Sequence, residues 1–95
     1  MAKVIEEPEI PQSDADYEGK TFLFQEAQGI IIGTVRKMGP MTIFLGADSV
    51  LVRDTGNIQD AVRNGTIPDL RKIPYLEIER MALRFKAPWN HKIPG

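Results

Sequence analysis

The sequence predicts a small, mainly β domain of the α+β class, preceded by an extended N-terminal arm. The expected architecture is an antiparallel sheet, or a partly open barrel or sandwich, of about five strands with one short helix. Residues 21–54 hold four short β-branched or aromatic runs separated by tight turns. Only residues 55–65 have helical spacing, and the acidic, proline-containing first 19 residues have no apolar period. These three observations define the expected fold.

Residues 1–19 are expected to form the arm. Pro8 and Pro11 each remove a backbone donor and favour extended backbone. Six acids against two bases give residues 1–20 a net charge of −4. The large apolar side chains of the arm, which we expect to contact a partner, are Val4, Ile5, Ile10 and Tyr17. A segment of this composition cannot bury enough apolar surface to order itself, so we expect a neighbouring chain to give it a fixed shape.

Four strands are expected between residue 20 and residue 54. Their sequences are TFLFQE from Thr21, the β-branched run from Ile30 to about Lys37, MTIFLG and SVLVRD. The links AQG, MGP and GAD are short and contain glycine, as tight turns do. We therefore expect the strands to follow one another as an antiparallel meander, with Phe22 and Phe24 on one face of the first.

The segment TGNIQDAVRNG interrupts the strand pattern. Its apolar side chains recur at i, i+3 and i+4 and form one narrow helical stripe: Ile58, Ala61 and Val62. Thr55 or Asn57 suits the N-cap, and Gly65 suits a left-handed residue beyond the end. We expect a helix near residues 57–64, stable only if its stripe docks on the sheet.

Residues 66–74 are expected to be a connecting loop, because they contain two prolines. The next segment, YLEIERMALRF, carries its apolar residues on one face up to Arg80 and on the other face beyond it. We therefore expect a β-bulge near Glu79–Arg80, or a strand that leaves one sheet and joins another. The β-rich domain then spans residues 20–86, and residues 87–95 form a C-terminal tail that contains Trp89.

Composition excludes several classes of protein. The chain has no cysteine, which excludes disulfides and thiolate metal sites. No apolar run approaches the ~20 residues that cross a bilayer, and the acidic N-terminus does not resemble a signal peptide. We expect one soluble domain with no membrane role.

Known catalytic patterns do not fit. EGKT at residues 18–21 resembles the end of a phosphate-binding loop, but Asp14 stands where that loop needs glycine, and a strand follows. His91 is the only histidine, and we expect it to face solvent. Neither Ser13 nor Ser49 lies in a strand–turn–helix elbow. We expect no enzymatic activity, no cofactor and no metal site.

Glu77 and Glu79 alternate along one expected strand. Paired carboxylates serve as acid and base in some enzymes. Alternating acids on a strand more commonly form its solvent-facing side, and we expect that here.

The C-terminal quarter is basic. Residues 71–95 hold six bases and two acids, a net charge of +4, whereas the whole chain carries −1. Arg80 and Arg84 are the expected partners of the acidic arm, and Trp89 is the expected anchor of the tail. We do not expect nucleic acid as a partner, because domains that bind it are usually strongly basic overall.

The stretch GIIIGTV…GADSVLVRDTGNIQDAVRNG resembles a loose class of small β-rich proteins encoded by tailed phages and prophages. The shared features are GxxxGT from Gly29 to Thr34, a second strand, a turn and a short amphipathic helix. The resemblance covers residues 22–65 and implies a viral origin and a small β-rich domain. It transfers no functional residue.

The expected function is structural. An arm and a tail around a small β domain suit a phage capsid decoration or cement protein, or a head–tail component. Its expected partners are copies of itself and a larger shell or connector protein, in a virion assembled in the host cytoplasm. The alternative is a small oligomeric phage protein that binds or sequesters a nucleotide or other anion through Arg53, Arg80 or Arg84, since arginine matches phosphate oxygens.

Overall fold

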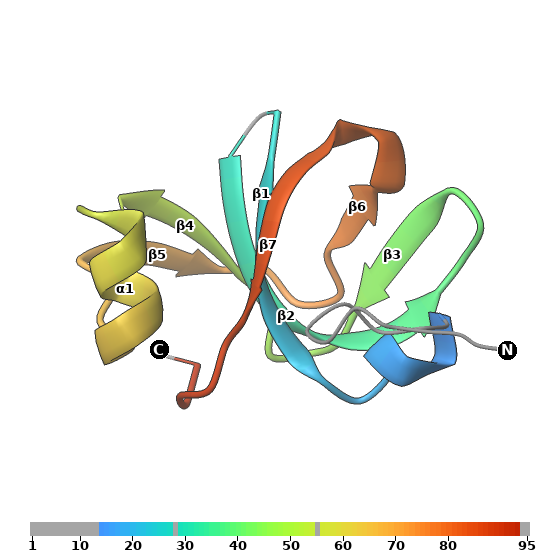
Figure 1. Cartoon of the computed structure of the whole chain (residues 1–95), viewed down its shortest axis with the longest axis horizontal. Coiled ribbons are helices and arrows are strands. Elements are labelled where there is room, and N and C mark those ends of the chain that lie inside the picture. The colour runs from blue at the N-terminus through green and yellow to red at the C-terminus, as the bar shows by residue number, and fades with distance from the viewer. Residues whose placement is uncertain (1–13, 28, 55, 94–95) are drawn as a thin grey trace, which may run out of the picture.

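The structure, a computed structural model, describes residues 14–27, 29–54 and 56–93. It is mainly β, with seven strands and one α-helix in this part of the chain (Figure 1). The elements are η1 (Asp14–Tyr17), β1 (Thr21–Glu26), β2 (Gly29–Met38), β3 (Thr42–Leu45), β4 (Val50–Asp54), α1 (Ile58–Asn64), β5 (Asp69–Lys72), β6 (Glu77–Glu79), η2 (Arg80–Ala82) and β7 (Leu83–Pro88).

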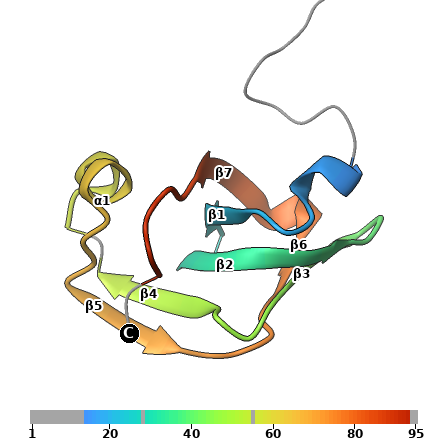
Figure 2. The same ribbon diagram turned by 90° about the horizontal axis from the view of Figure 1, so that it is seen from below.

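The strands form one antiparallel sheet that does not close on itself. Strands β1, β2, β3, β6 and β7 surround one apolar cluster, and we call this open, curled part of the sheet the barrel. Its main path runs β5-β4-β2-β1-β7, and β3 adds a branch that pairs with both β2 and β6. Figures 1 and 2 show the consequence: α1, β4 and β5 lie at one end of the molecule, and β3, β6 and η1 lie at the other. The predicted class, a mainly β fold with one short helix, is confirmed.

The long strand β2 belongs to both ends of the molecule. One edge of β2 pairs with β1 over its first six residues. The other edge pairs with β4 at Ile30–Ile32 and with β3 from Val35 to Met38. Strands β3 and β4 therefore lie end to end along the same edge, and a turn at residues 46–49 separates them.

A compact polar junction holds this turn on β2. The Gly46 N–H donates to the Thr34 carbonyl at 2.9 Å. The Thr34 hydroxyl donates to Asp48 Oδ2 at 2.6 Å, so the Thr21 hydroxyl, 2.8 Å away, donates to it in turn. Beside it, a Cβ at Gly33 would lie 3.0 Å from both Leu45 Cδ1 and Ser49 Oγ. The glycine and threonine at the end of GxxxGT are thus explained by the close approach of Leu45 and of the turn at residues 46–49 to β2.

The apolar side chains form two clusters on opposite faces of β1 and β2. The buried members of the barrel cluster are Tyr17, Phe22, Phe24, Ile31, Val35, Ile43, Leu45 and Ile78. Those of the helix cluster are Leu23, Ile32, Val50, Val52 and Trp89, with Ile58 and Val62 of α1 packed against them. Because adjacent residues serve opposite faces, the run GIIIGTV is apolar without alternation. Phe22 and Phe24 share a face, as predicted.

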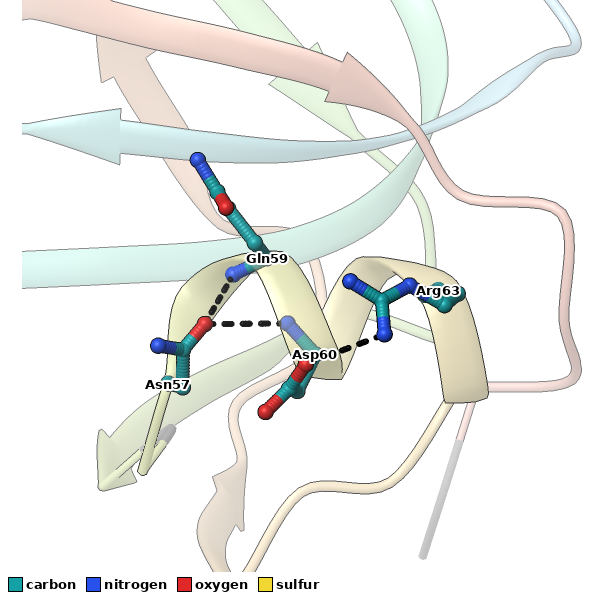
Figure 3. Close-up of polar contacts among 4 residues, drawn as sticks. All are labelled: Asn57, Gln59, Asp60 and Arg63. Carbon is teal, nitrogen blue, oxygen red and sulfur yellow. Dashed lines mark hydrogen bonds and ion pairs between the residues drawn. The ribbon is translucent and has the colours of Figure 1, made fainter.

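The helix forms where the sequence predicts it. Asn57 Oδ1 accepts from the backbone N–H groups of Gln59 at 2.9 Å and Asp60 at 3.1 Å (Figure 3). Asp60 also pairs with Arg63 at 3.3 Å, and Gly65 ends the helix with φ 75°. A helix of this length is marginal alone, so the docking of its apolar stripe on the helix cluster stabilises it.

Three details differ from the prediction. Strand β4 returns to β2 instead of pairing with β3, so the simple meander is wrong. The expected loop at 66–74 contains β5, which pairs with β4 by its backbone and has one half-buried residue, Leu70. Strand β7 continues to Pro88, beyond the expected end of the domain at residue 86.

The predicted break near residue 80 is confirmed as a change of pairing partner. Strand β6 pairs with β3, and β7 pairs with β1. The turn η2 lies between them and moves the chain from one pairing to the other. This connection brings the end of the chain back over β1 and narrows the opening of the barrel.

The Gly33→Ala variant is expected to lower the free energy of unfolding by about 1–3 kcal/mol, because the added methyl group would press on Leu45 and Ser49. Gly29→Ala is the matched control in the same strand, since its Cβ would meet nothing closer than 3.8 Å. Urea denaturation measures both. Equal stabilities for the two variants would contradict the close approach of Leu45 and Ser49 to Gly33.

Candidate partner-binding surface

The part of the arm that the structure describes, residues 14–19, is attached to the domain by side-chain packing and by backbone hydrogen bonds. Val4, Ile5 and Ile10 lie outside the described residues. Tyr17 is 6% exposed and packs against Phe22 with ring centroids 5.2 Å apart. The backbone then joins β2, because the Gly19 N–H donates to the Val35 carbonyl at 2.8 Å. Tyr17 is therefore part of the barrel cluster, and we remove it from the proposed partner contacts.

Trp89 is likewise used within the chain. Its side chain is 3% exposed in the helix cluster, and its Nε1 donates to the Lys92 carbonyl at 3.3 Å. Burial of this side chain leaves almost no surface for a partner. We therefore remove Trp89 from the proposed partner contacts as well. Through Trp89, the tail packs on the helix cluster.

The expectation that His91 faces solvent is wrong. The ring is half-buried, meets Trp89 edge-on at 5.3 Å between ring centroids, and places Nε2 2.8 Å from the Val62 carbonyl. This carbonyl belongs to the last turn of α1, where acceptors lack helical partners. A Cβ at Gly65 would lie 2.5 Å from His91 Cγ, so glycine is required there for packing as well as for capping. The sequence signals the cap but not the contact 26 residues later.

The two predicted arginines differ in their surroundings. Arg80, in η2, is half-buried and donates from Nη1 to the Gly39 carbonyl at 2.9 Å. This bond ties η2 to the turn between β2 and β3 and helps to hold the barrel. Arg84 is exposed at the point where the register of β7 against β1 shifts. Arg84 is the more accessible of the two for a partner.

A cavity of about 230 Å³ opens at the mouth of the barrel. Its lining residues come from η1, four strands and η2: Tyr17, Phe24, Met38, Ile43, Arg80, Leu83 and Lys86. Lys86 Nζ lies 5.2 Å from the centroid of the Tyr17 ring, a cation–π distance. Tyr17, near the C-terminal end of the arm, therefore lines a cavity that also contains the cationic side chains of Arg80 and Lys86.

A second hollow, of about 160 Å³, lies between α1 and β7. Ile58, Gln59 and Val62 of the helix line it on one side, and Phe85 and Ala87 line it on the other. We call this hollow the α1–β7 groove. Phe85 is 45% exposed, so the groove presents an apolar surface next to a strand edge.

Most of the C-terminal positive charge is not neutralised within the described part of the chain. The two ion pairs among described residues are Arg53–Asp69 at 3.7 Å and Arg63–Asp60 at 3.3 Å. Arg71, Lys72 and Arg84 are exposed and have no ion pair with a described acid. These side chains lie on the two terminal strands of the sheet, Arg71 and Lys72 on β5 and Arg84 on β7.

The residues considered for catalysis and metal binding have structural surroundings. Ser49 is fully buried, and its Oγ donates to the Gly46 carbonyl at 2.6 Å; Ser13 lies outside the described residues. Glu77 and Glu79 are exposed on β6, as predicted. No cluster of three potential metal ligands occurs among residues 14–27, 29–54 and 56–93. Within the same ranges, no helix is long and apolar enough to span a membrane.

Comparison with protein-family models, with curated proteins and with solved structures finds no match to this chain. Its functional interpretation therefore depends on its own residues.

Replacing Trp89 with alanine is expected to lower the free energy of unfolding by about 3–5 kcal/mol, as for other buried aromatic side chains. Met81, which is 86% exposed, provides the control, and Met81→Ala is expected to change stability by less than about 0.5 kcal/mol. Thermal unfolding followed by circular dichroism measures both. A Trp89→Ala protein as stable as the parent would contradict the assigned core position.

Proposed function

We propose that this protein is a non-enzymatic structural component of a phage particle, such as a capsid decoration, cement or head–tail protein. In this proposal, the acidic arm binds neighbouring copies and a larger shell or connector protein. The observation that carries the proposal is the charge separation between residues 1–20, of net charge −4, and basic side chains that lack ion pairs with described acids.

Opposite charges on separate surfaces favour association between chains. They raise the rate of encounter and fix which surfaces meet. The arm also carries Val4, Ile5 and Ile10, which supply apolar area that charge alone does not. Ordering such a segment on binding costs about 2–5 kcal/mol, so burial of this apolar area has to offset that cost.

The assignment to a phage particle rests on the resemblance of residues 22–65 to small phage and prophage proteins. The β-rich domain, with both faces of its central strands covered, is a small packed unit that suits the surface of a shell. Its expected location is the virion, after assembly in the host cytoplasm.

The alternative, binding of a nucleotide or other anion, has weaker support. The cavity at the barrel mouth offers Arg80 and Lys86 with two aromatic rings, a suitable set for an anion with an apolar part. Its volume of about 230 Å³ is below the range of about 300–1,000 Å³ of typical ligand sites. Arg53, the third residue of that prediction, lies on β4 at the opposite end of the molecule (Figure 1). Assembly through the arm is therefore the function that we propose.

A chain beginning at Asp14 is expected to stay folded, because η1 and Tyr17 remain in place. It is expected to self-associate at least about tenfold more weakly, because it lacks three of the six acids, Glu6, Glu7 and Glu9, and the aliphatic side chains Val4, Ile5 and Ile10. Sedimentation velocity over a range of protein and salt concentrations measures the association. Trp89 fluorescence confirms the fold.

A second variant keeps the full length and replaces Glu6, Glu7 and Glu9 with glutamine, which removes their charge but keeps the apolar side chains of the arm. This variant is expected to associate more weakly than the parent, and its association should depend less on salt, because exposed charge pairs are screened by ions. Unchanged association of the chain that begins at Asp14 would exclude the arm as the assembling element.

A further inference from the structure

Strand β7 ends the main path of the sheet at the side opposite β5. The Trp89 N–H donates to the Thr21 carbonyl at 3.0 Å, so by alternation Ala87 and Phe85 also direct their backbone groups towards β1. The N–H and carbonyl of Lys86 therefore point to the outer edge. Among the described residues no strand pairs with that edge, and an unpaired edge is a template for strand addition.

The two faces of this edge differ in chemistry. Phe85 and Ala87 face the α1–β7 groove with Ile58 and Val62. Lys86 points to the other face, towards the Tyr17 ring, and the exposed Arg84 stands close by in sequence. A ligand for this edge therefore needs apolar groups on one side and acidic groups on the other.

We propose that the outer edge of β7 and the α1–β7 groove bind residues 4–10 of a second copy of this chain as an added antiparallel strand. This inference rests on the proposed function, in which the arm binds a neighbouring copy. Strand addition of this kind takes affinity from main-chain hydrogen bonds and specificity from alternate side chains.

The arm fits the edge in one register. With Glu7 opposite Lys86, an antiparallel arrangement places Glu9 near Arg84 and Pro8 against Phe85. Two carboxylates then meet two cations on one face, while the proline ring covers the exposed aromatic ring on the other. Pro8 occupies a position whose N–H would point away from β7, which is where an edge strand tolerates proline. A shift by one residue would bring both Glu7 and Glu9 onto the apolar side, where the proposed register places only Glu6, opposite Ala87.

A second copy is a better source of this strand than the same chain. Figures 1 and 2 both show η1, from which the arm extends, at the opposite end of the molecule from α1. Tyr17 of η1 packs on the barrel face of the sheet, whereas the groove opens beside the helix.

The outer edge of β5 is a poorer template. It is also terminal in the sheet, but Asp69, Arg71 and Lys72 are all exposed on it. No residue of β5 lines either the α1–β7 groove or the cavity at the barrel mouth. The apolar side chains of the arm would remain in water there.

Disulfide cross-linking tests the register, and the parent chain suits it because it contains no cysteine. A full-length variant with Pro8→Cys is mixed with a tagged full-length variant with Phe85→Cys, under mild oxidation. The proposed pairing places the two Cβ atoms about 4.5–5.5 Å apart, a short closing distance for a disulfide. We expect the mixed dimer to be at least about fivefold more abundant than with the matched control, in which Lys72→Cys on β5 replaces Phe85→Cys.

Each outcome has a definite meaning. An excess of the mixed dimer over the control supports the proposal. Equal yields with the β5 control, or no mixed dimer, overturn the assignment to β7. A single chain carrying both Pro8→Cys and Phe85→Cys should give linked dimers; if it gives an internally linked monomer instead, the arm covers its own β7 and a second copy is not the occupant.

A charge exchange provides a second readout that needs no cysteine. Glu7→Lys is expected to weaken self-association by about threefold, and adding Lys86→Glu to the same chain should restore it. Lys72→Glu is the control and should not restore it. Without rescue by Lys86→Glu, the proposed register is wrong. The proposed function would still stand if the chain that begins at Asp14 fails to assemble, and would itself fail if the parent is monomeric.

Discussion

The whole fold depends on the backbone pairing of β2 with three neighbours. Its first half carries β1 on one edge and β4 on the other, and its second half carries β3. The change from β4 to β3 occurs opposite Thr34, whose carbonyl, N–H and hydroxyl all bond to the turn at residues 46–49. This junction connects the two ends of the molecule. Leu45 and Ser49 pack so closely against Gly33 that it has no room for a side chain. The two apolar clusters are thus built on consecutive residues, Ile31 and Ile32.

This arrangement determines which surfaces remain for a partner. Both faces of β1 and β2 are covered, one by the barrel and one by α1 and the tail with Trp89. Among the described residues, the accessible features include the outer edges of the terminal strands, the cavity at the barrel mouth and the exposed basic side chains. Edges normally carry features that discourage unwanted pairing. Pro88 at the end of β7 shortens the usable edge, which favours a short, specific segment over general aggregation.

Local signals in the sequence predicted local structure well. The stripe at Ile58, Ala61 and Val62, with Asn57 and Gly65 at its ends, located the helix, because capping and periodicity are encoded within one segment. The phase change at Arg80 likewise revealed the break between β6 and β7. Contacts between distant segments were not predictable in this way. Strand β5 was missed because it pairs with β4 through its backbone and only one of its side chains, Leu70, is half-buried. The positions of Trp89 and His91 depend on packing against α1, which no nearby residue encodes.

The most direct test of this account asks whether the two clusters unfold together. Trp89, the only tryptophan, reports on the helix cluster by fluorescence, and the methyl NMR signals of Ile43 and Ile78 report on the barrel cluster. Because β2 is common to both, we predict coincident transitions in urea with one midpoint, as a two-state domain shows. Separate midpoints, with one cluster melting while the other remains intact, would contradict the central role of β2.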